Sequence, residues 1–305
     1  MIPDIPYSKL RTFYYIAINK SFKKTALDLY ITDGAVSQQV KDLEQRFGKR
    51  LLERSSQKTF LTPDGVNLFN LIAPLVEKLE NLMPEFEKAS GRLCGKIRVA
   101  SSGAILLHLF PPYIKKFKRK YPECEIILFS VPGQQILSMI LGGEVDFGIG
   151  SVENIPDGIV GKERWCFKRY FIAPLGHPLS RKKHLTLEEI AQFPIVMSDR
   201  TSKSVQRLFD ELRRHNPNPK ITVEAGDWEV VLKYVEMGFG VSTVPGIVIQ
   251  PKDRKRLCMI DLRRIDESAD MSRYGILAKK GKYLPPVAKE LISFLSPNFD
   301  FDALK

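Results

Sequence analysis

Two short amphipathic segments, separated by a tight turn, dominate the first fifty residues. Ser21 can N-cap the first segment, whose apolar residues at helical spacing are Phe22, Ala26 and Leu29. Thr32, at the end of the turn, can N-cap the second segment, which Gly48 ends. The second segment has an apolar stripe of its own: Val36, Val40, Leu43 and Phe47. We therefore predict two helices that each bury one stripe.

The rest of the surface of the second predicted helix is polar. It carries Ser37, Gln38, Gln39 and Lys41. Two short helices joined by a tight turn, the second with an outward polar face, are what a helix-turn-helix needs to enter a major groove. Residues 54–62 have the composition of a short wing. Solvated glutamines on an ordinary helix pair would give the same periodicity, so the pattern alone leaves both interpretations open.

A long amphipathic stretch begins at Pro63. Its apolar residues recur every three or four positions: Val66, Phe69, Ile72, Leu75, Val76, Leu79, Leu82 and Phe86. A helix over 63–89 would be about 40 Å long. Its stripe must be buried on something, and a second copy of the same helix is the simplest partner. We expect a kink or helix end before Pro84, and a hinge between Gly91 and Gly95.

Strand-like and helix-like segments alternate after the hinge. The predicted strands are 97–100, 125–131, 145–149, 169–174, 195–197, 221–225 and 240–244. The predicted helices are 105–121, 134–141, 186–192, 204–214 and 228–237. Such alternation predicts parallel sheets with helices on both faces and a ligand at the carboxyl ends of the strands.

Several motifs along the chain match one family in order. In the N-terminal part they are AVSQQV at 35–40 and LTPDG at 61–65, and in the C-terminal part GEVDFGI at 143–149, APLGHPL at 173–179 and VEMGFGVSTVP at 235–245. Across nearly its whole length the chain resembles the LysR-type transcriptional regulators. That resemblance favours the DNA-binding interpretation of the helix pair.

The resemblance implies an α/β protein with an all-α winged helix-turn-helix domain at its N-terminus. The implied parts are the DNA-binding domain 1–62, a linker and dimerisation helix 63–90, and an effector-binding domain 91–305. The last part would hold two Rossmann-like subdomains, similar to periplasmic solute-binding proteins and joined by crossover strands near 160–165 and 271–276. Subdomain I would comprise 95–164 and 271–305, and subdomain II 165–270.

For DNA, Gln38 and Gln39 can each pair with base edges, and bidentate contact to adenine is the strongest geometry. Asp33 stands where most family members have Gln, so it either accepts from cytosine or faces the helix dipole. Lys41 and Arg54 suit phosphate contacts. The full set of expected DNA-contacting residues is Lys23, Thr32, Asp33, Ser37, Gln38, Gln39, Lys41, Arg54 and Lys58.

For the effector, Ser102 and Gly103 stand where the first predicted strand meets its helix, and backbone N–H groups at such a point favour a small anion. Ser102 merely capping that helix is the structural alternative. In the family, Thr is frequent at the Gly103 position. The resemblance places Ser202 opposite, on the second subdomain, and puts Thr201 and Asp227 at the rim of the pocket.

Composition narrows the function classes without deciding among them. The net charge of +12 is spread along the chain, since residues 1–62 hold 11 Lys and Arg against 6 Asp and Glu, and the other 243 residues hold 36 against 29. A basic protein suits a polyanionic partner. Scattered cysteines without a metal-ligand spacing predict free thiols in a reducing cytoplasm: Cys94, Cys124, Cys166 and Cys258. Neither a membrane span nor a secretory signal is expected.

Three classes of function compete. No GxSxG, P-loop, HExxH or convincing GxGxxG motif is present, so we expect neither catalysis nor a cofactor or metal. A small-solute receptor without DNA function shares the effector fold, but the expected helix-turn-helix and the missing signal peptide argue against it. The leading hypothesis is a cytoplasmic regulator that binds double-stranded DNA and a small, anionic effector. The family implies a homo-oligomer, commonly a tetramer built as a dimer of dimers, whose DNA bending responds to the effector.

Overall fold

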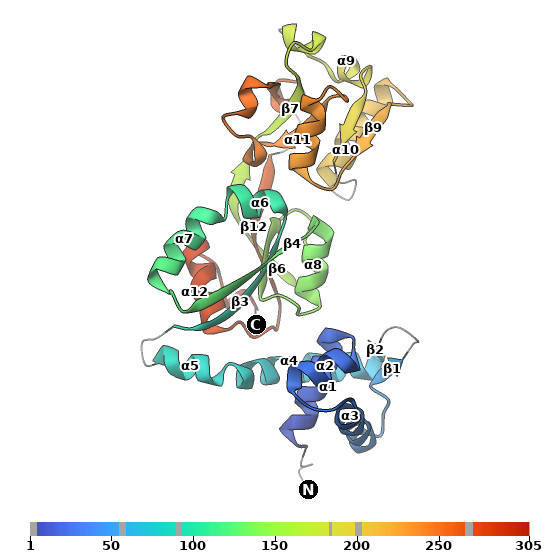
Figure 1. Cartoon of the computed structure of the whole chain (residues 1–305). Coiled ribbons are helices and arrows are strands. Elements are labelled where there is room, and N and C mark those ends of the chain that lie inside the picture. The colour runs from blue at the N-terminus through green and yellow to red at the C-terminus, as the bar shows by residue number, and fades with distance from the viewer. Residues whose placement is uncertain are drawn as a thin grey trace.

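The computed structural model describes residues 5–54, 59–89, 93–182, 185–198, 203–265 and 271–304. These residues form an N-terminal helical head, a pair of linker helices and an α/β domain with two lobes (Figure 1). The linker helices pass beside one lobe, here called subdomain I, and the other lobe, subdomain II, lies at the far end of the molecule (Figure 1). No helix of the described residues is both long and apolar enough to cross a membrane.

The head contains three helices and a two-stranded hairpin. They are α1 (Tyr7–Asn19), α2 (Phe22–Leu29), α3 (Asp33–Phe47), β1 (Leu52–Arg54) and β2 (Thr59–Leu61). The predicted caps form, since Ser21 Oγ accepts from the Lys24 amide at 3.2 Å and Thr32 Oγ1 from the Ala35 amide at 3.1 Å. Gly48 ends α3 in the left-handed conformation, with φ of 62°. The prediction for Phe47 was wrong, because its side chain is 40% exposed at the end of α3.

The linker is two helices, with the break before Pro84 that the sequence predicted. α4 (Pro63–Glu80) ends at Asn81, and α5 (Leu82–Ala89) begins at the next residue. Pro84 explains the break, because its ring excludes the carbonyl of Glu80 from a continuous helix while fitting the first turn of a new one. The helix end before Pro84 is therefore confirmed, and the uninterrupted helix over 63–89 is not.

The apolar residues of α4 lie on two faces. One face packs into the core of the head and is buried: Leu68, Phe69, Ile72, Ala73 and Val76. The ring of Phe69 stacks on Tyr14 of α1 with centroids 5.7 Å apart. The other face is exposed and continues onto α5: Leu71, Leu75, Leu79, Leu82, Met83 and Phe86. The prediction of a single apolar stripe was wrong, because its residues divide between these two faces.

Subdomain I is built on a five-stranded sheet in the order β4-β3-β5-β12-β6. Its strands are β3 (Gly95–Ser101), β4 (Cys124–Ser130), β5 (Phe147–Ser151), β6 (Ile159–Phe167) and β12 (Ser272–Lys279). Its helices are α6 (Gly103–His108), α7 (Pro111–Lys120), α8 (Gly133–Leu141) and α12 (Pro286–Leu295), with the short 3-10 helix η5 (Asp302–Leu304) near the end. The single helix predicted over 105–121 was wrong, because Pro111 and Pro112 start a new helix.

Subdomain II has two small sheets. β10 (Ser242–Pro245), β7 (Arg169–Pro174) and β11 (Leu257–Asp261) pair in that order, and β8 (Ile195–Met197) pairs with β9 (Ile221–Glu224). Its helices are α9 (Leu187–Ala191), α10 (Lys203–His215) and α11 (Trp228–Glu236). Four 3-10 helices complete it: η1 (Pro178–Arg181), η2 (Gly246–Val248), η3 (Asp253–Lys255) and η4 (Leu262–Arg264).

Two strands carry the chain between the subdomains. β6 runs from subdomain I into β7 of subdomain II, and β12 returns beside it, antiparallel, from Ser272 opposite Phe167 to Lys279 opposite Ile159. Because the returning strand inserts between β5 and β6, the sheet of subdomain I is mixed. In subdomain II, β10 and β11 both pair antiparallel with β7, so the prediction of parallel sheets was only partly right. Among the described strands, parallel ladders occur in β4-β3-β5 and in β8-β9.

Candidate DNA-binding face and ligand cleft

The outward side of α3 presents Gln38 and Lys41 to solvent, as the sequence predicted. Gln38 Nε2 donates to Asp42 Oδ1 at 2.7 Å, and Lys9 Nζ approaches Asp42 Oδ2 at the same distance. The Lys9 ammonium, and after it the Gln38 amide, lowers the pKa of Asp42 below its ordinary value. An ionised Asp42 thus anchors the amide of Gln38 and leaves its carbonyl oxygen facing outward.

Gln39 lies differently, half-buried against α1. The hydroxyl of Thr12, which is 1% exposed, donates to Gln39 Oε1 at 2.6 Å. A bidentate contact to adenine needs both Oε1 and Nε2 of a glutamine. In this arrangement Gln39 therefore has one of the two atoms engaged, and it links α1 to α3.

The other DNA residues expected from sequence fall into three groups. Thr32 caps α3 and Asp33 lies in the first turn of that helix, where its carboxylate faces the dipole. Lys23 is exposed on α2, and Ser37 is half-buried. The backbone of Arg54 pairs with Thr59 in the hairpin, but its side chain is not described. Lys58 lies outside the described residues.

A cleft of about 540 Å³ opens between the two subdomains. Subdomain I contributes the starts of α6 and α8 and the carboxyl end of β5. Subdomain II contributes the start of α11 and Arg169 at the start of β7, and the returning strand β12 contributes its first residues. Ligands of open α/β sheets bind at such strand ends.

Three of the expected effector residues lie together in this cleft. Ser102 precedes α6, and its hydroxyl accepts no hydrogen bond from the first turn of that helix, all of which is described. Gly103 faces Asp227, whose Oδ2 would lie 3.1 Å from a Cβ placed on Gly103. Asp227 itself caps α11, accepting from the Glu229 amide at 2.9 Å. Thr201 and Ser202 lie outside the described residues.

Arg169 is a cleft residue that sequence reasoning missed. It is 5% exposed and donates to Thr243 Oγ1 at 3.2 Å and to Ser272 Oγ at 3.5 Å. Its guanidinium carbon lies 5.9 Å from the ring centroid of Trp228. The available signal was a charged residue at the start of an otherwise apolar strand. A cation buried there needs polar partners, which indicates a polar site.

A second missed group joins the subdomains below the cleft. His108 Nε2 of α6 lies 2.8 Å from Glu229 Oε1 of α11, and Gln250 Nε2 lies 3.0 Å from His108 Nδ1. Since the amide nitrogen of Gln250 can only donate, Nδ1 accepts and the proton of a neutral imidazole lies on Nε2. Burial, and after it the neighbouring Asp227, raises the pKa of Glu229 to about 7, and burial lowers the pKa of His108.

The described residues contain no group of three or more His, Cys, Asp or Glu side chains placed to hold a metal ion. All four cysteines are free thiols. The polar side chains of the cleft are hydroxyls, carboxamides, carboxylates and the guanidinium groups of Arg169 and Arg273, which can bind and orient a polar ligand.

Two family models cover almost the whole chain. The LysR substrate binding domain matches residues 90–300, and the bacterial regulatory helix-turn-helix protein, lysR family, matches residues 7–66. This chain is a LysR-type transcriptional regulator. It therefore has a DNA-binding helix-turn-helix and an effector-binding domain, and it is a regulator and not an enzyme.

Individual relatives agree with this assignment. The transcriptional regulator SsuR of Burkholderia cenocepacia is 30% identical over 285 residues, which are 92% of this chain and 91% of SsuR. A full-length OxyR variant from Pseudomonas aeruginosa has the same fold, with a TM-score of 0.69 at 18% identity, over 96% of this chain and 98% of that one. The effector-binding domain of QuiR, solved in complex with shikimate, matches 66% of this chain and 95% of its own, with a TM-score of 0.57 at 17% identity.

Proposed function

We propose that this LysR-type regulator binds operator DNA as a homodimer through α3 and the wing, and that a small anionic effector in the cleft controls DNA binding or bending. The observation that carries the effector class is Arg169, a cation held 95% buried at the cleft between the subdomains.

The expected charge of the effector follows from two charged residues that line the cleft, Arg169 and Asp227. Arg169 provides a buried guanidinium, the group that best matches carboxylate, sulfate or phosphate geometry. Asp227 also lines the cleft, beside Gly103, where a second carboxylate would meet repulsion. We therefore place the anionic group near Arg169 and a hydroxyl or N–H donor near Asp227. Shikimate, with which QuiR was solved, combines one carboxylate with hydroxyls.

Three further residues complete the proposed effector site. The hydroxyl of Ser102, which does not cap α6, is placed to serve the ligand instead. Gly103 leaves the room that a side chain would take from Asp227. Thr201 and Ser202 join the site on the strength of the family resemblance.

For DNA, Gln38 and Ser37 would contact base edges, and Lys41, Lys23, Arg54 and Lys58 would contact phosphates. Gln39 would contact DNA mainly through its amide N–H groups, because the buried hydroxyl of Thr12 holds its carbonyl oxygen against α1. Thr32 and Asp33 would shape the start of α3. Chromosomal DNA as the partner places the protein in the cytoplasm.

The exposed face of the linker helices supports self-association. Leu71, Leu75 and Leu79 lie four residues apart on α4, and each is more than half exposed. A contiguous apolar face of this kind marks a protein interface. We infer that a second copy covers it and that two dimers assemble into a tetramer. We also keep the division into 1–62, 63–90 and 91–305, with 165–270 as subdomain II.

Two measurements on the purified full-length chain test this function. Fluorescence anisotropy with genomic DNA fragments should detect specific binding, and thermal denaturation with sulfate, phosphate or shikimate should raise the melting temperature by mass action. A chain that binds one of these anions but no DNA fragment would instead be a small-solute receptor. If no anion stabilises the protein, or if Arg169→Gln responds like the wild type, the proposed effector class is wrong.

A further inference from the structure

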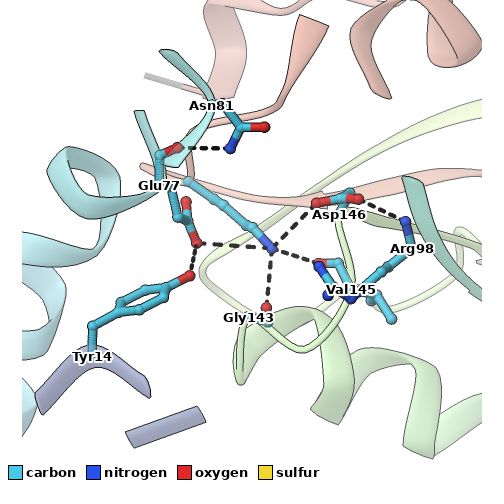
Figure 2. Close-up of polar contacts among 8 residues, drawn as sticks. Tyr14, Glu77, Asn81, Arg98, Gly143, Val145 and Asp146 are labelled. Atoms are coloured by element: carbon cyan, nitrogen blue, oxygen red, sulfur yellow. Dashed lines mark hydrogen bonds and ion pairs between the residues drawn. The ribbon is translucent and has the colours of Figure 1, made fainter. Parts of the chain in front are cut away.

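A buried polar cluster joins the head and linker to subdomain I (Figure 2), and none of its residues lines the cleft. It consists of Tyr14 of α1, Glu77 of α4, Asp146 just before β5 and Lys282 just after β12. We call these four residues the interdomain clasp. The side chains of Lys282, Asp146 and Glu77 are 7%, 9% and 11% exposed, so three formal charges lie almost out of water.

Lys282 is the centre of the clasp. Its Nζ donates to the carbonyl oxygens of Val145 at 2.7 Å and Gly143 at 3.1 Å. It also lies 4.0 Å from a carboxylate oxygen of Asp146 and 4.0 Å from Glu77 Oε1. Figure 2 shows Glu77 approaching from the linker side and Asp146 from subdomain I. The ammonium group therefore holds together parts of the chain that belong to different domains.

On the linker side of the clasp, the carboxylate of Glu77 has only part of its hydrogen-bonding capacity satisfied. Tyr14 Oη donates to Glu77 Oε1 at 3.0 Å, but Glu77 Oε2 is buried and has no hydrogen-bond partner among the described residues. Burial raises the pKa of Glu77 because Lys282 and Tyr14 offset only part of the desolvation. A buried, unpaired acceptor is costly, so the closed clasp is held with little excess stability. A cavity of about 610 Å³ beside it admits water to the charges if they separate.

The other side of the clasp is firmly held. Asp146 Oδ2 accepts from the Arg98 amide at 2.7 Å, and the Asp146 amide donates to the Arg98 carbonyl at 2.8 Å. These bonds fix Asp146 to β3 within the sheet of subdomain I. Opening is therefore expected between Glu77 and Lys282, and not between Lys282 and Asp146.

Four elements of subdomain I reach both the clasp and the ligand cleft. β3 carries Arg98 at the clasp and leads to Ser102 at the cleft, and β5 runs from Asp146 to Ser151. α8 has its first residues in the cleft and ends just before Gly143, and β12 begins at the cleft and ends three residues before Lys282. A sheet with these hydrogen-bonded strands moves as a unit, so a shift at the cleft also displaces the groups that hold Lys282.

We propose that Lys282 closes a reversible clasp between the DNA-binding head and the effector-binding domain, and that its opening is energetically coupled to occupancy of the cleft. The coupling rests on the proposed effector function, whereas the clasp itself does not. Because coupling between two sites is reciprocal, breaking the clasp must change the affinity of the cleft for its ligand.

Hydrogen–deuterium exchange of the full-length protein tests the clasp without any ligand. Lys282→Met removes the ammonium but keeps the length of the side chain, and should speed exchange in peptides covering 74–82 and 142–147 by about tenfold. Lys282→Arg should restore most of the protection, and Lys280→Met, at an exposed position two residues away, should leave it unchanged. If Lys282→Met does not fold, Glu77→Gln replaces it and should speed exchange at 74–82 alone. If the folded variant exchanges its amide hydrogens at 74–82 as slowly as the wild type does, the clasp proposal is wrong.

Titration with the anion that stabilises the wild type most, among sulfate, phosphate and shikimate, tests the coupling. Its Kd in Lys282→Met should differ from the wild-type value by at least about threefold, although Lys282 does not touch the cleft. An unchanged Kd overturns the coupling and leaves the effector function standing. If none of the three anions binds the wild type, the proposed effector class is wrong, and the exchange result alone decides the clasp.

Discussion

The DNA-binding face and the ligand cleft of this regulator are assembled in opposite ways. The proposed base-contacting part of the face, Ser37 and Gln38, lies on one helix whose caps and apolar stripe are local. The cleft gathers Ser102, Arg169, Asp227 and Tyr274 from both subdomains and from the crossing strands. A binding surface on one helix follows from periodicity, whereas a cleft exists only once distant segments have met. Mutations should therefore separate the two sites cleanly.

The largest effect is expected from the exposed face of the linker. Replacing Leu75 and Leu79 together by Glu places charges in the proposed dimer seam and should produce monomers. Loss of two-site binding should weaken DNA affinity by about 10²- to 10⁴-fold, while anion binding to each cleft stays unchanged. Sedimentation velocity and anisotropy measure the two effects, and Asn70→Glu, at an exposed position of the same helix outside the apolar face, is the control. A dimeric double variant with normal DNA affinity would show that the seam lies elsewhere.

Arg169→Gln should disable the cleft and spare the DNA-binding face. Losing a charge-assisted contact to a bound anion costs about 1.5–3 kcal/mol, which corresponds to roughly 10- to 150-fold in Kd. In the absence of ligand, the DNA affinity of the variant should stay within about twofold of the wild-type affinity, which is the scatter of such measurements. Arg273→Gln is the matched control, because Arg273 also lines the cleft but is exposed and pairs with Glu163 at 3.2 Å. Equal losses in both variants would mean that general positive charge, and not Arg169, attracts the ligand.

The two adjacent glutamines of α3 should behave differently. Gln38→Ala should reduce discrimination between specific and random DNA by about 1–3 kcal/mol without changing stability. Gln39→Ala should instead lower the free energy of unfolding by about 1–3 kcal/mol, because the buried hydroxyl of Thr12 loses its acceptor. Fluorescence anisotropy at fixed salt concentration measures the change in discrimination, and urea denaturation measures the change in stability. If Gln39→Ala instead loses discrimination between DNA sites without losing stability, Gln39 makes the bidentate contact with adenine after all.

The smallest effect concerns pH and the pair below the cleft. Glu229 has a pKa raised to about 7, so the folded state binds more protons than the unfolded state between pH 4.5 and 7, and this group destabilises the fold as pH rises through that range. The lowered pKa of His108 acts in the opposite sense below pH 6.5.

Glu229→Gln removes the first contribution and, because Glu229 Oε1 lies 2.8 Å from His108 Nε2, changes the second only below pH 6.5. Relative to wild type, the variant should gain about 1–2 kcal/mol of stability between pH 5 and pH 8, after allowance for solvent screening. Thermal or urea denaturation at the two pH values measures this difference, and Glu236→Gln, farther along α11, is the control. A constant difference between variant and wild type across the range would contradict the raised pKa.

Wherever the deciding interactions are local, the sequence predicted the structure. The caps formed by Ser21, Thr32 and Gly48, and the helix break before Pro84, depend on residues within one turn of each other. The family motifs also indicated the crossover strands and the place of Ser102. These features follow from backbone hydrogen bonding and the fixed geometry of proline and glycine.

Predictions failed where two elements compete for the same residues. The apolar positions of the linker gave one stripe in sequence but two faces in the structure, because α1 takes Phe69, Ile72 and Val76 into the head. Gln39 looked like its neighbour Gln38 until α1 supplied Thr12 as a partner. Likewise, the mixed sheet arises because β12 returns from subdomain II, which no local pattern encodes.

The sequence by itself determined the family, the helix-turn-helix, the outward face of α3 and one end of the cleft. Tertiary structure alone decided the role of Arg169, the bridge between His108 and Glu229 and the meeting of Glu77 with Lys282. Each of these contacts joins residues more than seventy positions apart, and its strength depends on burial that only the packed chain creates. A charged side chain looks the same in sequence whether it lies in water or in a core. Its chemistry is set by what surrounds it.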